Sequence, residues 1–191
     1  MKKLILTIGV VLIACLMSNA QHAELMMFSG EIKVDKLEKD EVYKHLSAWQ
    51  QEYMPKETIR ESDRGAGEIK GTSYLVYNSN VHAASEVTKG FILFDFKFVA
   101  IEDGFRYQIT NFRHEGKIRF HTILMTPSFP YKINAVEKPW YDLVWKDIRT
   151  QITQQTPKMV ASVKETIEKA ALLARNENEA KDSLLTQIGN E

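Results

Sequence analysis

The sequence has very little cysteine and no excess of charge of either sign. Cys15 is the single cysteine among 191 residues, so a disulfide scaffold and a cysteine-based zinc site are both excluded. The 25 basic and 25 acidic side chains cancel, which argues against a nucleic-acid binder and against a polybasic membrane-surface protein. A hydrophobic fraction of 44% is ordinary for a globular protein, and the length favours one domain.

The first 20 residues have the pattern of a secretory signal. Lys2 and Lys3 precede an almost wholly apolar stretch, residues 4–17, and small residues stand one and three positions before a cut after Ala20. A buried or amphipathic N-terminal helix is the alternative, but the stretch has no polar face. We expect the mature chain to begin at Gln21 in the periplasm or cell envelope, without a transmembrane span. Loss of the two lysines leaves 23 of the 25 basic groups against 25 acidic groups, a net charge of −2.

A second processing route starts from the same segment. Residues 12–15, Leu-Ile-Ala-Cys, resemble the lipobox in which a bacterial lipoprotein is cut and lipidated at cysteine, here Cys15. The apolar run continues past that cysteine through Leu16 and Met17, whereas a lipidated cysteine normally lies near the end of the run. Cleavage after Ala20 is therefore favoured, and lipidation of Cys15 remains the alternative.

Hydrophobic periodicity predicts strands and then helices along the mature chain. Strands are expected at residues 28–34, 58–61, 68–77, 91–101, 105–112 and 117–124, and loops at 81–88 and 126–139. A helix is expected to begin at Asp40 as the N-cap and to end before Pro55. Two C-terminal helices are expected between residues 139 and 175, the first opening at Pro139. Thr156-Pro157 should end the first and start the second, and the polar tail 176–191 should fray.

The hairpin around Asp103-Gly104 is the strongest local signal. A type I′ turn at these two residues would pair Ala100 with Tyr107, Phe98 with Ile109 and Phe96 with Asn111. One face of the hairpin would then be apolar and buried beneath helices, and it includes Phe94, Phe96, Phe98, Ala100, Tyr107 and Ile109. The other face would be polar and largely in water, with Asp95, Lys97, Arg106, Gln108 and Thr110. These elements predict an α+β fold, an antiparallel sheet of about five strands with helices on one face.

No pattern in the chain predicts catalysis, a metal or a cofactor. The glycines of Gly65-x-Gly67-x-x-x-Gly71 precede a strand, so they lack the helix N-terminus that a bound phosphate needs, and a turn is expected. His114 and His121 flank a turn and could approach each other, but separate histidines are the favoured interpretation. The other histidines, His22, His45 and His82, form no ligand motif, and the three tryptophans, Trp49, Trp140 and Trp145, lie on helical stripes that predict core positions.

Three stretches together resemble a known family. They are residues 30–34 leading into a helix at 43–49, the turn at 63–71, and residues 103–112, which read Asp-Gly-Phe-Arg-Tyr-Gln-Ile-Thr-Asn-Phe. They are similar to small exported proteins, mostly from Bacteroidota, that carry domain of unknown function 4468, which has a TBP-like fold. The resemblance covers about residues 30–113 and implies a curved antiparallel sheet backed by helices. It implies no activity, cofactor or site residue.

The sequence thus predicts a signal peptide at residues 1–20, one α+β domain at 21–175 with C-terminal helices at 139–175, and a tail at 176–191. The leading hypothesis is a non-catalytic envelope protein that acts as a binding or structural module for an unidentified envelope protein or ligand, with nucleic acid excluded as a partner. The first alternative is an envelope hydrolase built from scattered carboxylates and His114 or His121. The second is a surface protein anchored by lipid at Cys15.

Overall fold

The computed structural model describes residues 24–34, 37–130 and 140–188. The cleavage site at Ala20 and Gln21, the alternative lipidation site at Cys15, and the expected helix start at Pro139 all lie outside these residues.

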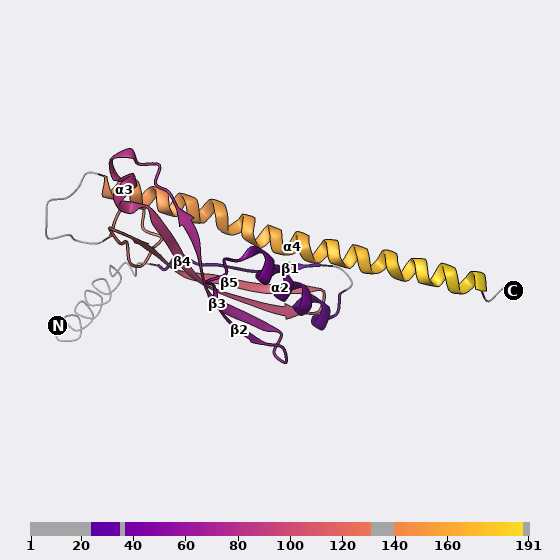
Figure 1. Cartoon of the computed structure of the whole chain (residues 1–191). Helices are drawn as coiled ribbons and strands as arrows, with labels where there is room; N and C mark the ends of the chain where they lie inside the picture. Colours follow the sequence, from indigo (N-terminus) through magenta and orange to yellow (C-terminus); the bar gives the residue numbers. More distant parts are fainter. Residues whose placement is uncertain (1–23, 35–36, 131–139, 189–191) are drawn as a thin grey trace, which may run out of the picture.

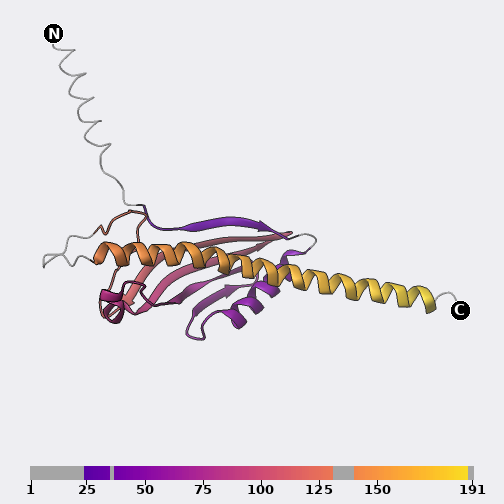
Figure 2. The same ribbon diagram turned by 90° about the horizontal axis from the view of Figure 1, so that it is seen from above.

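Five antiparallel strands form one open sheet in the order β1-β5-β4-β3-β2. The strands are β1 (Phe28–Lys33), β2 (Ile59–Asp63), β3 (Glu68–Tyr77), β4 (Gly90–Ile101) and β5 (Gly104–Gly116). Two helices, α2 (Lys39–Tyr53) and α4 (Tyr141–Ile188), lie on one face of this sheet (Figures 1 and 2). The α+β class and the helix-covered sheet are therefore confirmed.

The strand expected at residues 117–124 is wrong. This segment makes only isolated bridges, between Phe120 and His114 and between Leu124 and Leu25. Phe120 and Ile123 are both buried although they are three residues apart, so the segment lacks the period of two that a strand requires.

Helix α2 confirms the amphipathic prediction but begins earlier than expected. Its N-cap is Glu38, whose backbone N–H donates to the Glu41 carboxylate at 3.4 Å. Asp40 lies in the first turn, where a carboxylate stabilises the free N–H groups without being the cap. The helix ends at Tyr53, ahead of Pro55 as predicted. The loop expected at 81–88 contains two short helical turns, η1 (His82–Ala84) and α3 (Ser85–Thr88).

Helix α4 contradicts the predicted break at Thr156-Pro157, because it is one continuous helix with Pro157 inside it. Ile152, Thr156 and Val160 are all buried, so a single stripe packs inward on both sides of the proline. That packing holds the helix together although proline removes one backbone hydrogen bond. The helix extends to Ile188, through most of the tail for which fraying is expected, and projects beyond the sheet (Figure 1).

The β4–β5 hairpin has the predicted faces in a different register. Its two connecting residues are Glu102 and Asp103, and the strands pair Ala100 with Phe105, Phe98 with Tyr107 and Phe96 with Ile109. The predicted register was wrong by two residues, and a shift of two leaves every side chain on the same face. Asp103 has the positive φ (55°) that the turn needs. Gly104 belongs to β5 instead of the turn, and a Cβ there would lie 2.0 Å from the carbonyl oxygen of Ile32 in β1.

The core lies between the sheet and the helices, as the aromatic pattern predicted. Phe94, Phe96 and Phe98 are each at most 2% exposed, and the Phe98 ring meets Trp49 edge-on at 5.7 Å. Trp49 and Trp145 are buried as expected. Trp140 is half-buried at the edge of the core.

Candidate binding surface

Among the described residues, no helix covers the sheet face opposite α2 and α4 (Figure 2). All five strands contribute alternate side chains to it, because residues paired across antiparallel strands point to the same side. The residues predicted on the polar face all lie here, namely Asp95, Lys97, Arg106, Gln108 and Thr110. We call this the open sheet face.

Two hollows indent the open sheet face. One has a volume of about 280 Å³ and is lined by Lys70, Asp95 and Thr110 among others. The second has a volume of about 330 Å³ and is lined by Ser29 and Arg106 among others. Lys97 and Gln108 line both, so the hollows adjoin across β4 and β5. The structure therefore brings all five predicted polar residues into one continuous surface.

The charges of this surface are paired with one another. Lys97 pairs with Glu68, Lys70 lies 3.3 Å from Glu61, and the Arg106 Nε donates to Glu31 at 2.9 Å. The hydrogen bond from Lys97, followed by the lysine charges, holds the pKa of the Glu68 carboxyl below its ordinary value. A surface of alternating, mutually paired charges matches a partner of mixed charge better than a polyanion.

Asp95 is the most tightly held of these groups. Its carboxylate accepts hydrogen bonds from Thr72 Oγ1 and from Asn111 Nδ2, each at 2.7 Å, and lies 3.5 Å from Arg113. Burial by itself would raise the Asp95 pKa, but the two hydrogen bonds and the arginine charge outweigh it and hold that pKa below its usual range. Asp95 is thus a fixed anion across the physiological pH range.

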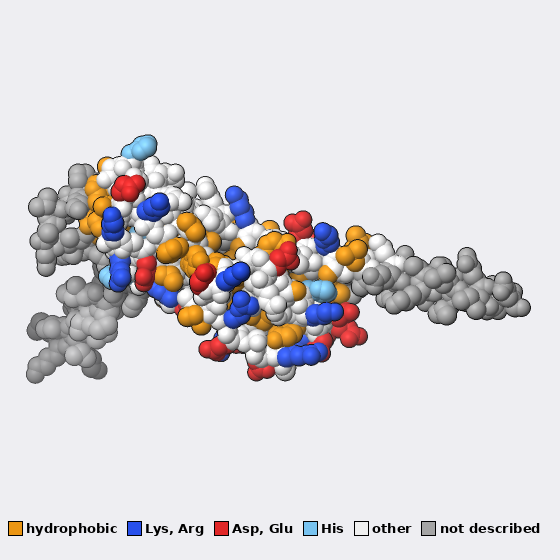
Figure 3. All heavy atoms as spheres, in the orientation of Figure 1, with side chains coloured by type: hydrophobic (Ala, Val, Ile, Leu, Met, Phe, Trp, Pro, Cys, Tyr) orange, Lys and Arg blue, Asp and Glu red, His pale blue; other side chains and the backbone are white. Residues whose placement is uncertain are grey.

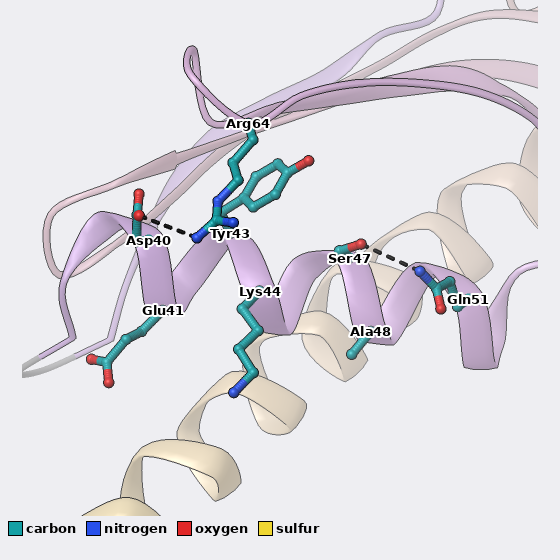
Figure 4. A pocket seen from close by; sticks show the side chains of 8 residues that line it. All are labelled: Asp40, Glu41, Tyr43, Lys44, Ser47, Ala48, Gln51 and Arg64. Carbon is teal, nitrogen blue, oxygen red and sulfur yellow. Dashed lines mark hydrogen bonds and ion pairs between the residues drawn. The ribbon is translucent and has the colours of Figure 1, made fainter.

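A third hollow lies on the outer side of α2, and no sequence pattern predicts it. Its volume is about 500 Å³. Arg64 reaches over it from the β2–β3 turn and lies 3.6 Å from Asp40, while Glu41 and Lys44 point away from that pair (Figure 4). Both partners of the ion pair are well exposed, so the arrangement contributes little binding energy.

The histidines do not form a site. His114 is buried, and its Nε2 donates to the carbonyl oxygen of Thr88 at 2.7 Å, whereas His121 is exposed. A β-bulge turns His114 inward, because Asn111 adopts a positive φ (54°) and the β4–β5 register shifts beside it. The described part of the chain holds no group of three His, Cys, Asp or Glu side chains placed to bind a metal.

Acidification is expected to destabilise the fold through His114. Burial lowers the His114 pKa below 6.5, and the hydrogen bond to Thr88 offsets this only in part. The unfolded chain therefore binds a proton before the folded chain does, so the free energy of unfolding falls as the pH drops below about 6.5. Urea unfolding at pH 7.5 and pH 5.5 should show this loss, and His114→Phe should reduce it. Part of the loss should persist through His45, whose pKa is also lowered by burial.

The matched control is His121→Phe, because His121 is exposed. It should keep the wild-type difference between the two pH values. An equal difference in wild type and His114→Phe would contradict the assignment to His114.

The glycine-rich segment is a turn, as predicted. Gly65 and Gly67 lie between β2 and β3, with Gly67 at φ 72°, and Gly71 lies within β3. A strand follows the turn, so the segment presents no helix N-terminus for a phosphate. Among the residues that the structure describes, none of the helices combines the length and hydrophobicity required to cross a membrane.

Comparison with known proteins agrees with this architecture. A TBP-like protein from Parabacteroides distasonis superimposes with a TM-score of 0.52 at 10% identity, over 73% of this chain and 92% of that one. A DUF4468 family protein from Bacteroides ovatus gives a TM-score of 0.51 at 12% identity, over 73% of this chain and 85% of that one. At such identities the likeness shows the fold alone. No protein of curated function matches the sequence significantly.

The match at the sequence level covers β1 through nearly all of β5. Residues 28–115 match the model of the family described as domain of unknown function (DUF4468) with TBP-like fold. The resemblance found in the three sequence stretches is thereby confirmed. Residues 28–115 of this chain match the DUF4468 domain of unknown function, and their fold is the TBP-like fold of that domain.

Proposed function

We propose that this chain is a non-catalytic binding module of the bacterial cell envelope, and that it holds a protein partner on the open sheet face. The observation that carries the proposal is the continuous uncovered surface on which the hollows adjoin at Lys97 and Gln108. Export by cleavage after Ala20 is part of the proposal and rests on the pattern of the first 20 residues.

Binding is favoured over hydrolysis by the state of the ionisable groups. An acid–base pair needs two groups whose environments move their pKa values apart. Here the carboxylates of Glu68 and Asp95 are both held in the charged form by neighbouring donors. Such groups orient a partner through hydrogen bonds and ion pairs and are poor proton donors near neutral pH.

The charges of the open sheet face indicate what kind of partner it would bind. On the open sheet face Lys97 pairs with Glu68 and Arg106 with Glu31. The side of the molecule drawn in Figure 3 likewise shows basic and acidic side chains interspersed. Paired charges contribute more to orientation and selectivity than to affinity. The proposed partner is a folded protein surface that also carries both signs of charge.

Photocrosslinking in cells tests the proposal. The full chain would carry a photoreactive amino acid at Gln108 and be expressed in a Bacteroidota species, with the mass of the mature chain reporting cleavage after Ala20. A discrete crosslinked protein is expected. Exchange of the charges by Lys97→Glu with Glu68→Lys should reduce its yield at least about tenfold, since the ion pair is retained while its polarity is reversed.

The control places the same crosslinker at Glu165, which is exposed on α4, in the helix layer on the other side of the sheet. It should not capture the same protein. Equal capture by the charge-exchanged chain would overturn the assignment to the open sheet face.

A further inference from the structure

One half of β3 has no strand beside it on its outer side. β2 pairs only with residues Glu68 to Thr72 of β3, while β3 continues to Tyr77. Beyond that ladder, Thr58 Oγ1 lies 2.9 Å from Ser73 Oγ, and the chain then leaves the sheet. Residues 73–77 are therefore hydrogen-bonded to β4 on one side only, and within the described residues no strand pairs with their outer side. We call residues 73–77 the open β3 edge.

The open β3 edge differs in composition from the other free edges of the sheet. β1 carries Glu31 and Lys33, and β2 carries three charged residues within its five. Charged residues on edge strands prevent unwanted pairing with other chains. The open β3 edge reads Ser-Tyr-Leu-Val-Tyr and has no charge, no proline and no glycine. Tyr and Val have a high preference for strands, and this edge lacks the charges that protect β1 and β2.

Apolar side chains flank this edge on the open sheet face. Val76 is 60% exposed and pairs across the sheet with Phe91, which is 46% exposed. The ring of Tyr74 meets that of Phe91 edge-on at 4.8 Å. A strand beside β3 would cover these side chains.

A groove flanks the same edge on the helix side. It has a volume of about 430 Å³ and lies between the end of α2, the middle of α4 and β3. The apolar and aromatic residues that line it include Trp49, Tyr53, Met54, Leu75, Phe94 and Met159. Among the described residues that line it, Lys158 alone is charged. The groove has room for a large apolar side chain, and Lys158 favours an acidic residue beside it.

We propose that the open β3 edge binds an extended peptide segment of a partner protein as a sixth strand. Backbone hydrogen bonds to residues 73–77 would supply affinity, as in other cases of strand addition. Because side chains alternate along a strand, one set would enter the groove and the other would cover Tyr74 and Val76. The segment recognised is apolar at successive positions and bears an acidic residue near Lys158. This site is separate from the polar residues of the proposed function and does not depend on them.

A partner peptide fits this edge better than a second copy of the chain. In a pairing of β3 with β3, each copy would have to fill the groove of the other with its helix-side residues. Ser73 is buried and Leu75 half-buried in their own fold, so they do not project far enough to do so. A peptide has side chains free to enter the groove.

Fluorescence anisotropy with a defined probe tests the proposal. The chain from residue 21 to 191 would be titrated against the labelled peptide Ser-Val-Phe-Val-Leu-Glu-Ser. Saturable binding is expected, and those backbone amides of residues 73–77 that point away from β4, which alternate along the strand, should become protected from hydrogen exchange. Two N-methylated versions of the peptide would be compared, one methylated at the odd-numbered nitrogens and one at the even-numbered nitrogens. One version should lose binding and the other should keep it, because only alternate N–H groups face β3.

Two matched variants locate the site. Val76→Lys should weaken binding at least about tenfold, by placing a charge on the edge. Val99→Lys makes the same change on the same face of the sheet, but in the central strand β4, and it should leave the peptide affinity unchanged. Lys158→Glu should weaken binding of this peptide. It should strengthen binding of a second peptide in which the glutamate is replaced by lysine.

Three results would overturn the proposal. The first is no binding at 1 mM peptide, and the second is an equal loss of binding in both N-methylated peptides. The third is sedimentation of the protein as a dimer that Val76→Lys dissociates, because that result would assign the edge to self-pairing. The charge exchange of Lys97 and Glu68 should leave peptide affinity unchanged. The two proposals can therefore fail independently.

Discussion

Replacement of Phe98 by alanine is expected to lower the free energy of unfolding by about 3–5 kcal/mol, the usual cost of deleting a buried aromatic ring. Phe98 is 1% exposed and lies at the centre of an aromatic cluster. Its ring centroid is 5.7 Å from Trp49, 5.9 Å from Phe96 and 6.1 Å from Phe105. These neighbours belong to α2, β4 and β5, so a cavity here weakens the contact between the helix layer and the sheet.

Urea unfolding followed by tryptophan fluorescence measures this effect, because Trp49 reports directly on the cluster. The control is Val99→Ala, one residue along β4 and on the open sheet face, where the side chain is only half-buried. It should cost less than about 1.5 kcal/mol. Equal losses for Phe98→Ala and Val99→Ala would show that the two faces of β4 are equally buried, contrary to the structure.

Replacement of Pro157 by alanine is expected to raise the free energy of unfolding by about 2 kcal/mol. Proline within a helix costs about 3 kcal/mol relative to alanine, because it has no N–H and its ring crowds the preceding turn. Alanine would restore the hydrogen bond to the carbonyl oxygen of Thr153. Alanine also leaves the unfolded chain freer, which offsets about 1 kcal/mol of the gain. Pro157 is exposed, so no packing is lost.

The matched control for this variant is Pro55→Ala. Pro55 follows the end of α2 and interrupts no helical hydrogen bond, so this change should not stabilise the protein. Thermal and urea unfolding of both variants gives the comparison. No gain from Pro157→Ala would mean that α4 is locally opened around residue 157 in solution.

The fold was predictable where one physical signal dominated. The alternation of Phe94, Phe96 and Phe98 with polar neighbours assigned both faces of β4 correctly, because burial leaves a period of two in the sequence. The same alternation located the polar residues that line the two hollows. It could not determine the hairpin register, since a slip of two residues preserves the faces and the close approach of β1 to Gly104 is a tertiary contact.

Other features depend on contacts that no local pattern encodes. In the sequence, Pro157 predicts a helix break. The structure shows why the helix continues, because buried residues from Ile152 to Val160 form one stripe across the proline. His114 reads as an edge histidine, and it is buried because a bulge at Asn111 changes which side chains face inward. The open β3 edge had a signal that could have been used, because the strand expected at 58–61 was much shorter than its neighbour at 68–77.

The sheet order also separates the first strand from its neighbour by most of the domain's length. β2 to β5 form a meander in which every strand pairs with the next along the chain, so each pairing closes a short loop. β1 is made before all of them, yet among the described strands it pairs with β5 alone, with Phe28 opposite Ile109. The first strand to be synthesised thus cannot pair until β5 has been made, and its arrival closes the longest loop in the sheet. Until then β5 is itself an unprotected edge, and a chain slowed at this step exposes that edge to other molecules.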